Sequence, residues 1–202
     1  MLNPVNTLSN GNLDATAAGN NRVSLTTLGI PASGKWYFEF TDVDSSSGAF
    51  IFGVGAEDVS ITSYLGTSSS GWGYQTHASN AGYWNNNTFT TTGQINGHGS
   101  NTVVGVAVDR DAGKIWFGIG GTFVNSGAPA SGTNAQYTNL PSTGVLFPGA
   151  SCAIGKKFIL NAGQRPFAYT APSGYKALCT ANLPDPTIAD GSTAMDVVTY
   201  SG

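Results

Sequence analysis

The chain has 202 residues, of which only 9% are charged, against about 25% in an ordinary soluble domain. Eight Lys and Arg against eleven Asp and Glu give a net charge of −3, which leaves no basic surface for a nucleic-acid partner. No apolar run reaches the ~18 residues of a membrane span. A hydrophobic content of 40% is too high for intrinsic disorder. These features exclude nucleic acid and membrane insertion, and they predict a folded domain with a neutral polar surface.

The N-terminus has no basic segment followed by an apolar one, so the sequence predicts no secretory signal peptide. We therefore expect synthesis in a cytoplasm without export by the secretory route.

Alternating hydrophobicity begins at residues 35–41, where the aromatic residues Trp36, Phe38 and Phe40 share one side of an extended chain. A period of two predicts a half-buried antiparallel strand, with Tyr37 and Glu39 on the other, outward side. Residues 50–55 repeat the pattern with glycine on the alternate face, which indicates close approach of another backbone.

The clearest unit is a β-hairpin over residues 102–119. Three valines of 104–108 form one strand face, and Ile115, Phe117 and Ile119 form the face of the next. Between them the sequence Asp-Arg-Asp-Ala-Gly of 109–113 is typical of a turn, because Asp favours its start and Gly accepts a positive φ at its end.

The rest of the sequence predicts further short strands. No stretch has the 3.6-residue periodicity of a helix, although residues 57–65 are long enough for one short helical turn. The strands are expected at 22–27, 71–75, 82–85, 145–148, 151–154, 157–161 and 175–181, with turns at 45–48, 96–97, 120–121 and 172–174. About a dozen short strands predict an all-β fold, an antiparallel two-sheet β-sandwich.

Two prolines, Pro184 and Pro186, lie near the C-terminus at positions where a central strand cannot continue through them. We therefore expect a β-sandwich domain over 1–183. Residues 184–202 are expected to form a linker and either an edge strand or the start of a further element.

The two cysteines, Cys152 and Cys179, lie in apolar, strand-like sequence. Buried free thiols are the favoured interpretation and one cross-strand disulfide is the alternative. Two cysteines alone do not hold a zinc ion.

Five segments together resemble the SPRY domain family, and the resemblance runs from Leu2 to Leu183. They are 34–40, 52–55, 71–74, 104–109 and 113–117, followed by a Phe147-Pro148 pair. The resemblance implies a bent, concanavalin-like jelly roll that binds partners through loops at one end and has no catalytic activity. The insert at 127–133 departs from eukaryotic members, so none of their peptide-binding residues is carried over.

The flanks, 2–13 and 164–184, resemble SPRY-containing proteins of tailed bacteriophages, which lie on the virion surface, often in tail fibres. This resemblance implies a location in the virion. The leading candidate partner of the protein is then a host surface receptor, either a glycan or a protein. The alternative is a structural head or tail decoration that docks on other virion proteins. Fibre proteins are often homotrimers, but the sequence has no heptad stalk to indicate one.

The sequence contains few residues that are candidates for catalysis. His77 and His98 are the only histidines, both in polar loop sequence, and no nucleophile elbow is present. Glu39 and Glu57 are the only glutamates, which disfavours a glycan depolymerase with paired carboxylates. We expect no catalytic residue, no cofactor and no metal site; a weak calcium site at Asp42 and Asp44 is the disfavoured alternative.

Binding residues are expected where aromatic and amide side chains cluster in sequence, since such groups stack on and hydrogen-bond to a neutral ligand. The candidates are Tyr64, Trp72, Tyr74, His77, Tyr83, Trp84, Asn85 and Asn86. The competing interpretation places Trp72 and Trp84 in the core and the asparagines in a solvated turn.

Overall fold

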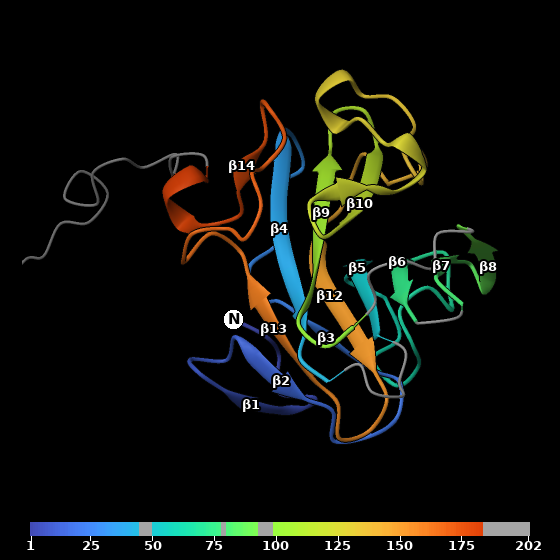
Figure 1. Ribbon diagram of the computed structural model, residues 1–202, viewed down its shortest axis with the longest axis vertical. Helices are drawn as coiled ribbons and strands as arrows, with labels where there is room; N and C mark the ends of the chain where they lie inside the picture. Colours follow the sequence, from blue (N-terminus) through green and yellow to red (C-terminus); the bar gives the residue numbers. More distant parts are fainter. Residues whose placement is uncertain (45–49, 78–79, 93–98, 184–202) are drawn as a thin grey trace, which may run out of the picture.

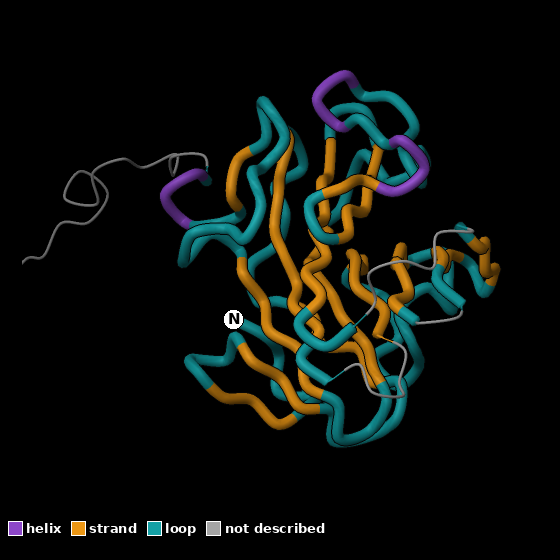
Figure 2. The backbone as a smooth tube through the Cα atoms, viewed as in Figure 1, coloured by secondary structure: helices purple, strands orange, loops and turns teal. Residues whose placement is uncertain are grey.

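The computed structural model describes residues 1–44, 50–77, 80–92 and 99–183, and it shows two β-sheets packed face to face (Figures 1 and 2). All strand pairs are antiparallel except one. The predicted all-β two-sheet sandwich is confirmed. The predicted turns at 45–48 and 96–97, the segment 184–202 and His98 lie outside the described residues.

The eight-stranded sheet has the order β1-β2-β13-β4-β9-β10-β11, and β14 pairs with β4 in parallel. Its strands are β1 (Thr7–Ser9), β2 (Asp14–Thr16), β4 (Lys35–Asp42), β9 (Thr102–Asp109), β10 (Lys114–Ile119), β11 (Thr122–Phe123), β13 (Lys157–Asn161) and β14 (Lys176–Ala177).

The six-stranded sheet has the order β3-β12-β5-β6-β7-β8. Its strands are β3 (Arg22–Leu25), β5 (Phe50–Ala56), β6 (Gly71–Thr76), β7 (Gly82–Asn85), β8 (Thr88–Thr91) and β12 (Leu146–Cys152). Three short 3-10 helices, at Val124–Ser126, Pro129–Ser131 and Thr180–Asn182, lie in the connections (Figure 2).

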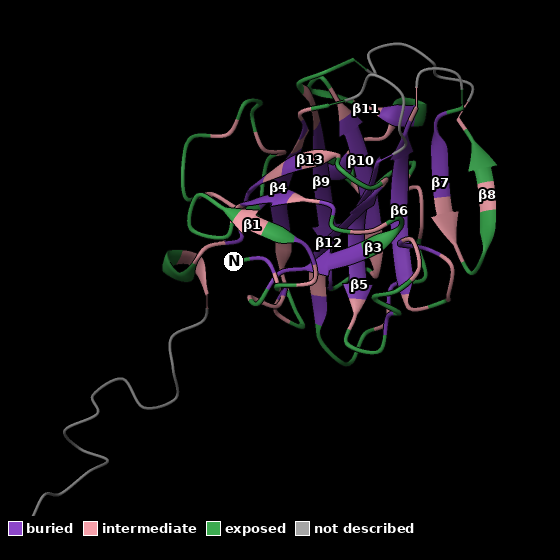
Figure 3. Cartoon of the chain, turned by 90° about the horizontal axis from the view of Figure 1, so that it is seen from below, coloured by how far each residue is buried: buried purple, intermediate pink, exposed green. Residues whose placement is uncertain are grey.

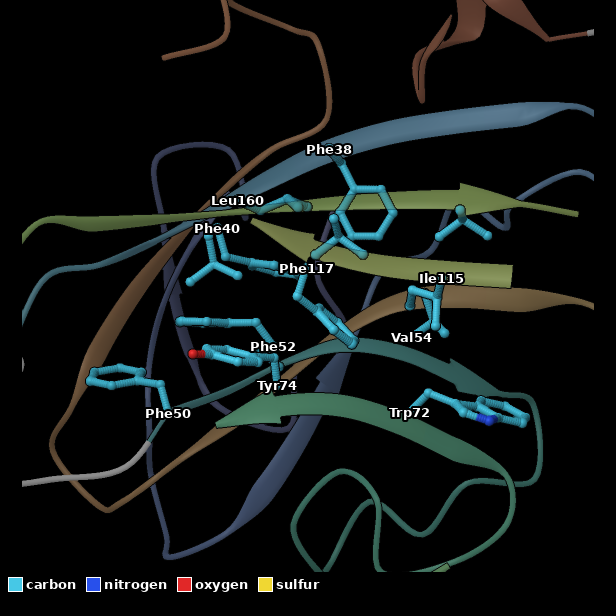
Figure 4. Packing of buried hydrophobic residues seen from close by; sticks show 14 of the residues in the cluster. Phe38, Phe40, Phe50, Phe52, Val54, Trp72, Tyr74, Ile115, Phe117 and Leu160 are labelled. Atoms are coloured by element: carbon cyan, nitrogen blue, oxygen red, sulfur yellow. The ribbon is translucent and has the colours of Figure 1, made fainter. Parts of the chain in front are cut away.

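The core fills the space between the two sheets with the apolar faces that the alternation predicts (Figure 4). Phe40 of β4 stacks on Phe52 of β5 with ring centroids 4.9 Å apart. Phe158 of β13 meets both rings edge-on. Such aromatic contacts add to the stabilisation from burying the rings themselves.

The predicted hairpin is β9 and β10. Asp109 pairs with Lys114, and the Asp109 carboxylate accepts a 2.9 Å hydrogen bond from the amide of Ala112. Gly113 has a φ of +64°, which its lack of a side chain permits.

Two predicted strand boundaries are wrong. The strands expected at 145–148 and 151–154 are one strand, β12 (Leu146–Cys152), because its pairing with β5 runs without a break over these residues. The expected strand at 175–181 is only the two-residue β14, because the Asn182 side chain bonds the carbonyl of Ala177 and the chain turns into a 3-10 helix.

The outer face of β4 was expected to meet solvent, and the structure corrects this. Tyr37 and Glu39 are each 2% exposed, because the C-terminal segment 163–175 covers this side of the sheet. Phe167 packs edge-on against Tyr37 at 4.9 Å. The Glu39 carboxylate accepts the amides of Ala168 at 2.8 Å and Tyr169 at 3.0 Å.

The two cysteines are free thiols, as the favoured interpretation predicts. Cys152 lies in the core, where burial raises its pKa to about 12. Cys179 is half-buried rather than buried, and its sulfur accepts a hydrogen bond from the Asn182 side chain.

The buried carboxyl of Asp42, at the end of β4, predicts a pH-dependent stability. Burial raises its pKa from 3.8 to about 6, although hydrogen bonds from the Asp44 amide and from Thr76 partly oppose the rise. The folded state therefore binds this proton more tightly than the unfolded state. Stability contributed by the neutral carboxyl is present below about pH 4 and is lost as the pH rises through about 6.

We expect Asp42→Asn to remove this dependence. One pKa unit corresponds to about 1.4 kcal/mol, so wild type should lose about 3 kcal/mol of unfolding free energy relative to the variant between pH 4 and pH 7. Urea unfolding at several pH values measures the difference. Glu57→Gln, at an exposed position and outside the groups that shift the Asp42 pKa, is the control. A constant gap between wild type and Asp42→Asn at all pH values would contradict the assignment.

Candidate binding surface

The alternation of β6 and β7 sorts the predicted binding residues onto opposite faces of the six-stranded sheet. Tyr74 and its register partner Tyr83 point inward and are 0% and 5% exposed. Trp72 is also inward and 4% exposed. Trp84 pairs with Gly73 on the outer face. The structure therefore places Tyr74 and Tyr83 in the core and brings Trp84 to the surface.

Tyr64 and Trp84 form the walls of a pocket of about 230 Å³ on the outer face of the six-stranded sheet, here called the Tyr64–Trp84 pocket. The two rings meet edge-on, with centroids 4.8 Å apart. The remaining lining residues come from four other parts of the chain; they are Asn21, Ile51, Gln75, Ser151 and Cys152.

Hydrogen bonds hold this pocket in shape before any partner binds. The Trp84 indole N–H donates to Gln75 Oε1 at 2.8 Å, and Gln75 Nε2 donates to the Asn80 carbonyl at 2.8 Å. Ser151 Oγ accepts the Leu65 amide at 3.0 Å and thereby fixes the loop that carries Tyr64. A preorganised pocket loses less conformational entropy on binding.

Gly66 explains how Trp84 reaches its position. A Cβ on Gly66 would lie 2.5 Å from the Cβ of Trp84, and the glycine has a φ of +100°. Only glycine combines this backbone conformation with so close an approach.

Two large apolar side chains, Ile154 and Ile61, are exposed, and their backbone groups bond to residues near the edge strand β3. Ile154 is 59% exposed, and its amide donates to the side chain of Asn20, next to the lining residue Asn21. Ile61 is 43% exposed, and its carbonyl accepts the amide of Val23. Large exposed apolar groups are typical of an interaction surface.

A second hollow, the polar groove, lies at the opposite, inner side of β7 and β8. It consists of two neighbouring cavities, the first of about 450 Å³ and lined by Asn85, Asn86, Thr88, Thr90 and residues 135–139. The second, of about 530 Å³, is lined by residues 56–58, Ser69, Ser70, Trp72, Asn139, Pro141 and residues 143–145. Asn139 lines both, and its Oδ1 accepts the Trp72 indole N–H at 2.9 Å.

The asparagines of the predicted site have structural roles as well. Asn86 and Asn87 have φ values of +50° and +56°, which suit the tight turn between β7 and β8. Asn85 donates from Nδ2 to the carbonyl of Gly71 at 2.8 Å and also lines the groove. His77 follows β6 and lines neither hollow.

The charged groups do not assemble into a recognisable centre. Within residues 1–44, 50–77, 80–92 and 99–183, no group of three His, Cys, Asp or Glu side chains is placed to hold a metal ion. The same part of the chain contains no helix long and apolar enough to cross a membrane. Asp109 instead pairs with Lys35 at 3.2 Å, and Asp14 with Lys157 at 2.8 Å.

Comparison with known proteins gives one family. The family model described as "SPRY domain" matches residues 35–165. The structure is similar to the crystal structure of the SPRY domain of human HERC1, with a TM-score of 0.62 and 19% sequence identity. The match covers 82% of this chain and 100% of that chain. No curated protein sequence matches.

Proposed function

The chain belongs to the SPRY domain family, and we propose that its Tyr64–Trp84 pocket binds an exposed segment of a partner protein. SPRY domains are generally non-catalytic modules for protein–protein interaction. The observation that carries the proposal is the pocket itself, where two aromatic rings lie 4.8 Å apart and a hydrogen bond to Gln75 holds the Trp84 ring.

The chemistry of the pocket indicates what it accepts. Aromatic walls and the apolar floor at Ile51 favour an apolar or aromatic side chain. Gln75 and Asn21 offer amides at the wall, where they can bond the backbone of an extended segment. A volume of about 230 Å³ suits one or two side chains rather than a folded surface.

The proposed setting is the surface of a bacteriophage virion, where the module contacts a host surface receptor. The support is the resemblance of the flanks 2–13 and 164–184 to virion surface proteins. The second candidate partner is another virion protein, with the module as a head or tail decoration. Both partners would present the same kind of segment to the same pocket.

Adsorption of the fluorescently labelled protein to cells of the bacterial host tests the first setting. We expect Tyr64→Ala to weaken adsorption about 30-fold, because a central aromatic contact contributes about 2 kcal/mol to such an interface. Trp84→Phe, which keeps a ring but loses the bond to Gln75, should weaken it less. Tyr169→Ala removes an exposed tyrosine over the other sheet and should change nothing.

The location in the particle separates the two partners. Electron microscopy of virions decorated with an antibody to this chain should show label at the fibre tips if the host receptor is the partner. Label at contacts between subunits, with no adsorption by the isolated protein, would favour the decoration role. The absence of label from the virion would overturn the proposed setting.

A further inference from the structure

The inner face of the six-stranded sheet changes from apolar to polar where the other sheet no longer covers it. One row of register partners runs Phe52, Tyr74, Tyr83 and Thr90 across β5, β6, β7 and β8. The first three are buried and Thr90 is exposed. Figure 3 shows β6 buried throughout, while β8 at the edge of the sheet is largely exposed. The change in residue type therefore coincides with the start of the polar groove.

The opposite wall of the groove is fixed by its own hydrogen bonds. Gln136 Oε1 accepts the Phe117 amide at 2.8 Å, and its Nε2 donates to the Val124 carbonyl at 3.1 Å. Tyr137 forms a bridge with Ile115 and meets the Tyr83 ring edge-on at 5.9 Å. Both walls of the groove are therefore fixed by hydrogen bonds or strand pairing. Each of its two cavities has the size of an ordinary ligand site, ~300–1,000 Å³.

The lining specifies a neutral ligand that is rich in hydroxyl groups. Along the β8 half of the groove every lining side chain is uncharged, and most carry an amide or a hydroxyl. The half-buried ring of Tyr137 adds an aromatic surface. Amides and hydroxyls pair with sugar hydroxyls, and aromatic rings pack against the apolar C–H faces of sugars.

The other half of the groove adds selectivity against acidic ligands. Glu57 and Asp58 are exposed at its end, and Asp58 Oδ2 accepts a 2.9 Å hydrogen bond from Ser70. Two carboxylates would repel an anionic sugar chain. Asn139 lines both cavities, so the two lie next to each other along the groove.

We propose that the polar groove is a second binding site, one that holds a segment of a neutral linear polysaccharide. This site does not rest on the Tyr64–Trp84 pocket, which lies on the opposite face of the same sheet. A module with both sites would bind a sugar chain and a protein segment independently.

Titration of the isotope-labelled full chain with neutral linear tetrasaccharides of glucose, mannose, galactose and N-acetylglucosamine, followed by NMR, tests the proposal. At least one should bind in the millimolar range or more tightly, with the largest shift changes at Asn85, Thr88, Thr90 and Asn139. Tetragalacturonate, an acidic chain, should not bind.

Matched substitutions on one strand locate the site. Thr90→Arg places a long charged side chain in the groove and should weaken saccharide binding at least tenfold. Thr91→Arg makes the same change on the opposite face of β8 and should leave binding unchanged. Equal melting temperatures of the two variants would exclude a folding effect.

Three results would overturn the proposal: no binding of any neutral chain, shift changes centred on Tyr64 and Trp84, or equal weakening by the two arginine variants. Tyr64→Ala keeps this test distinct from that of the proposed function. It should weaken adsorption to host cells about 30-fold while saccharide binding to the groove persists.

Discussion

Gly53→Ala is expected to prevent folding of the sandwich, or to lower its free energy of unfolding by more than about 3 kcal/mol. Gly53 lies in the middle of β5, between β12 and β6. A Cβ there would overlap the carbonyl oxygen of Trp72 and lie 2.9 Å from the Cα of Gly73. Both atoms belong to the backbone of the paired strand β6, so no side-chain rotation relieves the clash.

Gly99→Ala is the matched control, because a Cβ on Gly99 meets no atom within 4 Å and the residue has no positive φ. Urea unfolding of wild type and both variants, together with the yield of soluble protein, measures the effect. We expect Gly99→Ala to lie within about 0.5 kcal/mol of wild type. An unfolding midpoint for Gly53→Ala equal to that of wild type would show that the two strands separate more easily than their packing indicates.

Glu39→Ala is expected to lower the free energy of unfolding by about 3–5 kcal/mol. The Glu39 carboxylate accepts three hydrogen bonds, from the Tyr37 hydroxyl at 3.1 Å and from the amides of Ala168 and Tyr169. Its removal leaves the buried Tyr37 hydroxyl without its acceptor, at a cost of about 1–3 kcal/mol, and it also breaks two part-buried hydrogen bonds to a charged group, which contribute about 1.5–3 kcal/mol each at most. The segment 163–175 should then detach from the sheet first.

Chymotrypsin measures that detachment directly, since it cleaves after aromatic residues and the segment contains Phe167, Tyr169 and Tyr175. Cleavage there should be faster in Glu39→Ala than in wild type under native conditions, with Glu39→Gln between them because its amide keeps one acceptor oxygen. Glu57→Ala, the other glutamate and an exposed one, is the control. Unchanged cleavage and unchanged stability of Glu39→Ala would contradict the role given to this carboxylate.

Local pattern predicts most of the strands of this protein. The period of two at 35–41 and the turn sequence at 109–113 lead directly to β4 and to the β9–β10 hairpin. The pattern fails at the outer face of β4, because the residues that cover Tyr37 and Glu39 come from about 130 positions later in the chain. Nothing in the local alternation distinguishes a face that meets solvent from one that a distant segment covers.

The candidate site was predictable only in part. The predicted site includes Tyr64 and Trp84, which share a pocket, but it also includes Tyr74 and Tyr83, which lie in the core. The same alternation, applied to 82–85, would have separated Trp84 from Tyr83. Ile154 and Asn21 were beyond reach, because they join this surface through pairing of β12 and β3 at the far edge of the sheet.

The low charge of the chain is also a property of its two candidate binding surfaces. The Tyr64–Trp84 pocket is lined entirely by uncharged residues, and so is the β8 half of the polar groove. Partners that bind such surfaces are recognised by shape, apolar contact and neutral hydrogen bonds. We therefore expect adsorption to depend weakly on salt, since ionic screening acts on charged pairs.

Hydroxyl-radical footprinting of the protein, free and adsorbed to host cells, tests the central claim most directly. Oxidation is read at individual side chains, and aromatic rings are among the most reactive. The account predicts that Tyr64 and Trp84 become protected on adsorption while Tyr169, exposed on the other sheet, keeps its reactivity. Adsorption that protects Tyr169 and leaves Tyr64 and Trp84 as reactive as in the free protein would contradict it.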